Sequence, residues 1–189
     1  MAPLTTALKE WSIAVEALLS GDLILLLRKG GLREKAGRFQ AQVGDRALLM
    51  PTLEHQKPHW LKPPWRDRVD SPAAAQPASH AITLGGWAEI THLHALTDAP
   101  QVHQLTPHHI WTSQWAQERM AWQPDRPIYL LLLRVYRLPV PQTVPNHPSY
   151  GGCRSWVGLQ TALSSKDSTP VLSDQVYGDR VQTMLNLLP

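Results

Sequence analysis

The chain has 189 residues, 43% of them hydrophobic, and its 18 lysines and arginines outnumber 15 acidic residues, for a net charge of +3. This length suits a single domain over residues 1–189, in which we take residues 139–189 as a C-terminal extension. The lone cysteine, Cys153, excludes an internal disulfide and a cysteine-based zinc site, and it is typical of a reducing compartment such as the cytoplasm. No apolar run approaches the ~20 residues that cross a bilayer, so neither membrane association nor a secretory signal is expected. The mild positive charge permits nucleic acid as a partner without requiring it.

The first segment is predicted to be a helix that docks on the rest of the domain. Its apolar residues recur at alternating intervals of four and three positions, which is the period of one helical face. These residues are Leu4, Leu8, Trp11, Val15 and Leu18.

Four apolar segments predict β-strands that share one sheet or barrel: residues 23–27, 47–50, 90–96 and 128–133. A further strand is expected over residues 80–84, followed by a turn at Gly85 and Gly86. Residues 57–79 carry five prolines and no periodicity, so they predict a long surface loop that is mobile over residues 66–79.

Two further helices are expected in the second half of the chain. A Thr-Pro pair at residues 106–107 is typical of a helix start and predicts a helix to about residue 121. A second Thr-Pro pair, at residues 169–170, predicts a C-terminal helix to about residue 188. The predicted fold class is therefore α+β, with a small mixed or antiparallel sheet or barrel, an N-terminal docking helix, one internal helix and a C-terminal helix. One side of the internal helix should bury Trp111, Trp115 and Trp122.

Three segments resemble strands of the PUA, ASCH and EVE-like barrels. They are the Gly-Asp-Arg-apolar segment at residues 44–50, the Trp-Ala-Glu-Ile segment at residues 87–90, and the apolar segment at residues 127–138. The resemblance implies a barrel with a cleft for RNA or for modified DNA bases.

The whole chain also resembles a bacterial family of uncharacterised proteins known as domain of unknown function 1802. Six short motifs carry this resemblance, and they lie at residues 7–11, 27–31, 51–56, 108–111, 133–136 and 150–153. It implies a family name and no established activity.

A basic glycine turn follows the first predicted strand. Lys29, Gly30 and Gly31, flanked by Arg28 and Arg33, could hold a phosphate between backbone N–H groups and cationic side chains. The alternative is a plain turn on a basic surface. No P-loop and no dinucleotide-binding motif occurs.

A carboxylate pattern near the second predicted strand suggests different chemistry. Asp45 precedes this strand, and Glu54, His55 and Gln56 follow it. Two acids and a third polar group loosely resemble the PD-(D/E)xK nucleases, in which the acids hold a divalent metal ion. Gln56 is not basic and Asp45 precedes its strand, so this interpretation stays an alternative.

Histidines and tryptophans supply further candidates. His108 and His109, with His55 or His59, could form a metal site, but adjacent residues on a helix point about 100° apart. We therefore expect one packed and one exposed histidine, and no metal or other cofactor. Three tryptophans lie near loops or glycines: Trp60, Trp65 and Trp87. A tryptophan in such a position can stack on a base, although any single one is more often a core residue.

The leading hypothesis is a non-enzymatic module that binds RNA or modified DNA. A metal-dependent nuclease using Asp45, Glu54 and Gln56, and a structural subunit that binds a protein partner, remain alternatives, so whether the chain is an enzyme stays open. The expected ligand-binding residues are Arg28, Lys29, Gly30, Gly31, Arg33, Glu54, His55, Gln56, His108, His109 and Trp111.

Overall fold

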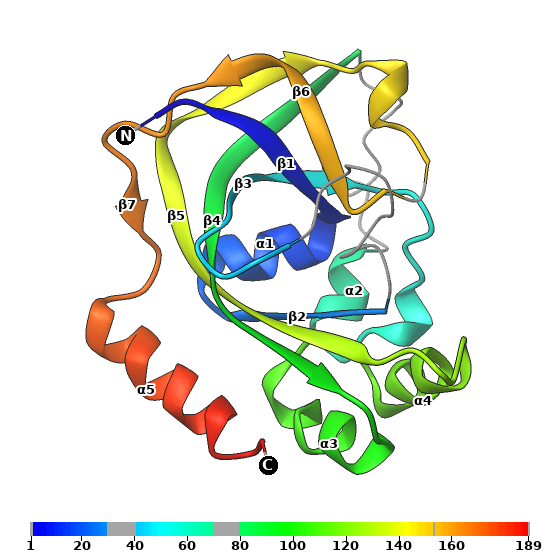
Figure 1. Cartoon of the computed structure of the whole chain (residues 1–189). Helices are drawn as coiled ribbons and strands as arrows, with labels where there is room; N and C mark the ends of the chain where they lie inside the picture. The colour runs from blue at the N-terminus through cyan, green and yellow to red at the C-terminus, as the bar shows by residue number, and fades with distance from the viewer. Residues whose placement is uncertain (1, 30–40, 70–79, 153, 189) are drawn as a thin grey trace.

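The computed structural model describes residues 2–29, 41–69, 80–152 and 154–188 (Figure 1). Within these residues, seven strands form one mixed sheet in the spatial order β2-β5-β4-β3-β1-β6, and β7 pairs with β5. The predicted α+β class is confirmed, and the four predicted apolar strands do lie in one sheet. The strands are β1 (Leu4–Trp11), β2 (Leu25–Arg28), β3 (Arg46–Thr52), β4 (Ala81–Leu96), β5 (Ile128–Pro145), β6 (Trp156–Leu163) and β7 (Thr169–Pro170).

Helices and helical turns cover the sheet and connect its strands. The α-helices are α1 (Ser12–Ser20), α2 (Trp65–Val69), α3 (Ala99–Gln104), α4 (Ser113–Ala121) and α5 (Asp174–Leu185). Three short 3-10 turns are η1 (Pro58–Trp60), η2 (Thr106–His108) and η3 (Pro148–Tyr150).

The N-terminal helix predicted from the apolar stripe is wrong in its first half. Residues 4–11 form β1, which pairs in parallel with β3 and antiparallel with β6, and the helix begins only at Ser12. Both faces of β1 are buried: Ala7 packs into one hydrophobic cluster and Leu8 into another. A strand covered on both faces shows no alternation of apolar and polar residues, so the spacing matched a helix by coincidence.

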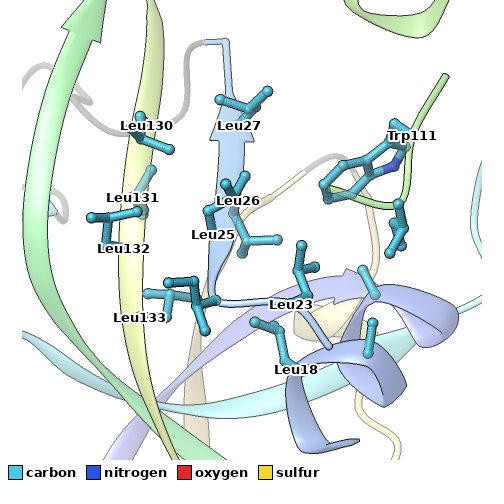
Figure 2. Close-up of a cluster of buried hydrophobic side chains, with 14 of the residues drawn as sticks. Leu18, Leu23, Leu25, Leu26, Leu27, Trp111, Leu130, Leu131, Leu132 and Leu133 are labelled. Atoms are coloured by element: carbon cyan, nitrogen blue, oxygen red, sulfur yellow. The ribbon is translucent and has the colours of Figure 1, made fainter. Parts of the chain in front are cut away.

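Leucines of distant segments meet in the larger hydrophobic cluster. Residues 25–28 of β2 pair antiparallel with residues 129–132 of β5, so two leucine-rich stretches more than 100 positions apart lie side by side. Figure 2 shows these leucines together with Leu18 of α1 and Trp111, which pack from a different side. The apolar composition of both strands is explained by this burial.

The turn predicted at Gly85 and Gly86 is wrong, because β4 continues through both residues. The pairing of β4 with β5 shifts register between Leu84 and Gly86 instead. A Cβ atom at Gly86 would lie 2.4 Å from the carbonyl oxygen of Tyr136. The glycines therefore allow close backbone approach within a strand rather than a chain reversal.

The two Thr-Pro pairs do not begin the predicted helices. The first lies in η2, and α4 begins at Ser113 behind Thr112, whose hydroxyl accepts a hydrogen bond from the N–H of Trp115 at 3.3 Å. The second pair forms β7 and bonds to β5, while Ser173 caps α5. The first pair is therefore part of a 3-10 turn. The second pair is extended because it is paired with Arg137 and Tyr136 of β5.

The predicted loop at residues 57–79 contains two elements, η1 and the short helix α2. Residues 66–69 of the stretch predicted as mobile are helical, and residues 70–79 lie outside the described residues. The last fifty residues contribute β6 and α5: Val157 of β6 is in the smaller hydrophobic cluster, and Tyr177 of α5 is in the larger one.

Candidate nucleic-acid interface

The end of β2 meets the ends of β1 and α4, since Arg28 contacts Lys9 and Glu10 of β1 and Lys29 contacts Met120 of α4. Arg28 lies at the centre of this junction. Its Nη2 donates to the carbonyl oxygen of Lys9 at 2.8 Å and lies 2.7 Å from a carboxylate oxygen of Glu10. Its Nη1 donates to the hydroxyl of Ser155 at 3.2 Å. Arg28 therefore joins β2 to β1 and to the segment before β6.

Lys29 points into the protein rather than toward solvent. Its side chain is only 7% exposed, and its Nζ donates to the carbonyl oxygen of Met120 at 2.8 Å, in the last turn of α4. Burial lowers the pKa of this ammonium group. The remaining predicted members of the glycine turn, Gly30, Gly31 and Arg33, lie outside the described residues.

Arg119 is a second arginine of interest and lies near the end of α4. Its guanidinium carbon lies 5.5 Å from the ring centre of Trp115. Burial, and then the positive charge of Arg28, lower the pKa of Arg119, while Glu10 raises it. No described residue accepts a hydrogen bond from this guanidinium. The carboxylate of Glu10 is itself ion-paired with Arg28.

The predicted residues at 54–56 pack beside the same edge. The exposed carboxylate of Glu54 lies 3.0 Å from the Nζ of Lys9, and Lys9 also donates to the carbonyl oxygen of Tyr150 at 3.0 Å. The amide oxygen of Gln56 accepts from the hydroxyl of Ser12 at 3.1 Å and from the N–H of Ile13 at 3.3 Å, which closes the start of α1. These contacts hold β1, α1 and β3 together.

His55 is exposed and has a positive φ of 60°. It lies between Glu54 and Gln56 in the segment that follows β3.

The nuclease arrangement is contradicted by this geometry. Asp45 precedes β3 and Glu54 follows it, and a seven-residue strand separates them by roughly 20 Å. The carboxylate of Asp45 accepts from the N–H of Gln42 at 2.8 Å, which shapes a local turn. No group of three or more His, Cys, Asp or Glu residues in the described parts of the chain is placed to hold a metal ion.

His109 is a packed histidine. It is only 5% exposed, and its Nδ1 accepts from the N–H of Trp111 at 3.2 Å. Burial, with Lys62 close by, lowers its pKa to about 3, so the ring is neutral at neutral pH. Its Nε2 has no hydrogen-bond partner among the described residues, and its ring centre lies 5.6 Å from that of Trp111 and 6.1 Å from that of Trp115. His108 is half-buried, whereas the expectation was one packed and one exposed histidine.

The segments 54–62 and 108–112 lie side by side. Leu61 pairs with Trp111 in an isolated β-bridge, and the N–H of Thr112 donates to the carbonyl oxygen of Trp60 at 2.8 Å. Trp60 in turn stacks on Trp11 with ring centres 6.0 Å apart. The structure thus connects residues 108–112 to residues 60–61 and, through Trp60, to the end of β1.

A family model described as "Domain of unknown function (DUF1802)" matches residues 7–183. The chain belongs to this family. No curated protein matches this chain. Among solved structures it is similar to crystal structures of ASCH from Zymomonas mobilis. The ASCH protein itself has 12% identity and a TM-score of 0.44, with 82% of this chain and 87% of that chain covered. A tyrosine-to-phenylalanine variant of it has 11% identity and a TM-score of 0.46, with 82% and 90% covered.

Two residues of this DUF1802 domain were missed by sequence reasoning. Arg119 carries no motif, and its relation to Arg28 arises only from the fold. Trp122 was predicted to be a core residue because it repeats the spacing of Trp111 and Trp115, both of which are buried. The helix ends at Ala121, however, so Trp122 leaves the buried face and is 50% exposed. The helix end was the signal that could have revealed it.

The three tryptophans predicted near loops are buried or half-buried. Trp65 and Trp87 are buried, and Trp87 stacks on Tyr136 with ring centres 4.1 Å apart. Trp60 is half-buried, with the Nζ of Lys57 4.2 Å from its ring centre. None of the helices in the described ranges combines the length and apolar character that a bilayer crossing requires.

Proposed function

We propose that this domain is a cytoplasmic module that binds nucleic acid, RNA or modified DNA, at the end of α4. The proposal rests on two residues at the end of α4, Arg119 and Trp122, which are three positions apart in the sequence. Arg119 lies in the last turn of the helix, and Trp122 is the residue that follows its end. One supplies a guanidinium without a hydrogen-bond acceptor among the described residues, and the other supplies an indole that is 50% exposed.

The charge at this place favours a polyanion. Arg28 at the end of β2 and Arg119 near the end of α4 are both cationic, and the carboxylate of Glu10 is paired with Arg28. Arginine contacts phosphate oxygens through a planar fork of N–H donors, which is the commonest way in which proteins hold a nucleic-acid backbone. Lys57, which lies over the ring of Trp60, is a further cation on the neighbouring segment.

The exposed indole supplies the second element of such an interface. A large aromatic side chain at the surface costs free energy unless something covers it. Stacking of a base on an aromatic ring is tolerant of sequence and contributes about 1–3 kcal/mol per base. Only an unpaired base presents its face, so a single strand fits Trp122 better than a duplex.

The test is equilibrium binding of labelled single-stranded and duplex RNA and DNA, measured by fluorescence anisotropy over a range of salt concentrations. We expect Trp122→Ala to weaken single-strand binding about 5- to 150-fold and Trp122→Tyr to retain most of it. Val140→Ala, which truncates an exposed apolar side chain on β5, should have no effect. If no nucleic acid binds at low salt, the proposal is wrong and the structural-subunit interpretation replaces it.

A further inference from the structure

Two histidines lie two positions apart on β4, directly after a register shift in its pairing with β5. His92 pairs with Leu132 and His94 pairs with Leu130, and the shift lies between Ile90 and His92. Residues at this spacing on a strand project from the same face of the sheet. The two imidazole rings are nearly parallel, with an interplanar angle of 11° and centres 6.4 Å apart.

The side chain of Thr91 determines which nitrogen of His92 carries the proton. A threonine hydroxyl has one O–H donor and two acceptor lone pairs. Its O–H donates to the carbonyl oxygen of Leu132 at 3.2 Å, so its oxygen accepts from the hydroxyl of Tyr177 at 2.5 Å and from the Nδ1 of His92 at 3.0 Å. Nδ1 therefore holds the ring hydrogen, and Nε2 presents a lone pair.

This arrangement is the one that a metal-ligating histidine adopts. Such a histidine binds the ion through one ring nitrogen and donates its other N–H to a neighbouring acceptor, which fixes the orientation of the ring. Burial, and then the charge of His94, lower the pKa of His92, so the neutral form that binds metal ions prevails at neutral pH. No hydrogen bond joins the ring of His94 to another of the described residues, so its nitrogens are available as well.

The separation of the two rings suits a shared ion. Zn²⁺ lies about 2.0–2.1 Å from an imidazole nitrogen and therefore about 3.2 Å from the ring centre, so two rings on one ion have centres no more than about 6.5 Å apart. The observed 6.4 Å lies within this limit. A tetrahedral ion draws the centres to about 5.2 Å, so the two rings must turn toward each other by about 1 Å on binding. Both residues are half-buried, which leaves each partly exposed to solvent.

We propose that His92 and His94 bind one divalent transition-metal ion, such as Zn²⁺, through one imidazole nitrogen each. Among the described residues, no His, Cys, Asp or Glu completes a group of three, so the other coordination positions are left to water or to a ligand from solution. Mg²⁺ is excluded as the ion, because it takes oxygen ligands. The proposal departs from the expectation, drawn from the sequence, that the chain binds no metal ion, and it is independent of the proposed function.

The experiment is calorimetric titration of the purified chain, freed of metal by a chelator, with Zn²⁺ and with Mg²⁺. We expect one Zn²⁺ per chain to bind more tightly than any other, and no binding of Mg²⁺. Cu²⁺ added to the same chain should give an electron paramagnetic resonance spectrum with two coordinated imidazole nitrogens.

The variants separate the ligands from the group that orients one of them. His92→Gln and His94→Gln each remove a ligand and should weaken Zn²⁺ binding at least about 100-fold. Thr91→Val removes the acceptor of the Nδ1–H and should weaken binding about 10- to 100-fold, which is the scale for a partner of a ligating histidine. His80→Gln and His103→Gln, at exposed histidines, are the controls and should leave the affinity unchanged.

Thermal unfolding supplies a second measurement and confirms that each variant is folded. An ion that binds only the folded chain raises its Tm, so Zn²⁺ should raise the Tm of the wild type more than that of His92→Gln. Zn²⁺ affinity that is unchanged in either His92→Gln or His94→Gln overturns the two-histidine site. Loss of binding in a control variant places the ion elsewhere and also overturns it. Absence of Zn²⁺ binding by the folded wild type overturns this proposal and leaves the proposed function standing.

Discussion

The ammonium group of Lys29 donates a hydrogen bond of 2.8 Å to the carbonyl oxygen of Met120, so the end of β2 holds the end of α4. This bond matters for the site because Arg28 and Arg119 are the residues that precede its two partners. The position of one guanidinium relative to the other therefore depends on a buried lysine that itself faces away from solvent.

Replacing Lys29 with methionine should lower stability and disturb the arginine pair. The substitution keeps the apolar stem but leaves the carbonyl of Met120 without its partner, which costs about 1–3 kcal/mol. Because the ammonium group is buried, nucleic-acid binding should weaken through misplacement of Arg119. The slope of log K against log salt concentration should then change by less than one unit. Urea unfolding and salt-titrated binding measure the two effects. Lys166→Met, at an exposed lysine, is the control, and equal stability of the two variants would contradict the expectation.

Acid should destabilise the domain through His109. Its pKa is about 3 in the folded state and about 6.5 when unfolded, so folding favours the neutral ring. The stability contributed by this histidine is fully present above pH 6.5 and is lost progressively as the pH falls toward 3, by at most about 1.4 kcal/mol per pH unit.

Urea unfolding of His109→Phe at pH 7, 6 and 5 checks this expectation. The wild type should lose about 2 kcal/mol more stability between pH 7 and pH 5 than the variant does. His103→Phe, at an exposed histidine of α3, should behave like the wild type in its pH dependence. Parallel pH profiles for wild type and His109→Phe would exclude the histidine as the cause.

A methyl group at Gly86 should be strongly destabilising. Its Cβ would lie 2.4 Å from the carbonyl oxygen of Tyr136, and this backbone atom cannot move without separating β4 from β5. Gly86→Ala should cost at least about 1–3 kcal/mol, the scale of overpacking in a core. Gly158→Ala in β6, where nothing lies within 4 Å of the added atom, should be neutral or slightly stabilising. The free energy of unfolding in urea compares the two, and a smaller effect at Gly86 would show that the strands separate easily.

The hydroxyl of Tyr177 should help to hold α5 on the sheet. It lies 2.5 Å from the hydroxyl of Thr91 on β4, and Thr91 also donates to the carbonyl of Leu132 at 3.2 Å. Tyr177→Phe and Thr91→Val should each cost about 1 kcal/mol, and the double variant should cost less than their sum because the two groups share one bond. Additive effects would mean that the hydroxyl groups act independently. Tyr129→Phe on β5 is the control for loss of a phenol.

The elements that the sequence predicted well are those whose burial dictates their composition. Residues 128–133 and 23–27 are apolar because both faces are covered, and a short fully apolar run between turn residues is typical of a strand. The same double burial misled the prediction for β1, in which Leu4, Leu8 and Trp11 matched a helical period that the strand does not use. Local spacing carries no information about which faces neighbours will cover.

The candidate site was predictable only where its residues are adjacent in the chain. The segment at residues 54–56 and the histidine pair stood out as motifs; Glu54 contacts Lys9 of β1, and His109 packs on Trp111 and Trp115. Arg119 and Trp122 carry no motif, because their neighbours come from β2 and from the end of a helix whose length the sequence did not specify. Asp45 and Glu54 show the converse: nine positions of separation in an extended strand remove any shared chemistry.

The order of pairing in the sheet also bears on how the chain folds during synthesis. β1 is made first, yet one of its two partners, β6, follows about 150 residues later. At typical rates of translation that interval is about 10 s, during which one edge of β1 has no neighbour. β2 likewise has no partner until β5, about 100 residues later in the chain, has been synthesised. Contacts this distant in sequence are typical of slow folding. The nascent chain should therefore need a chaperone, or another cover for the exposed edge of β1, until its last quarter has emerged from the ribosome.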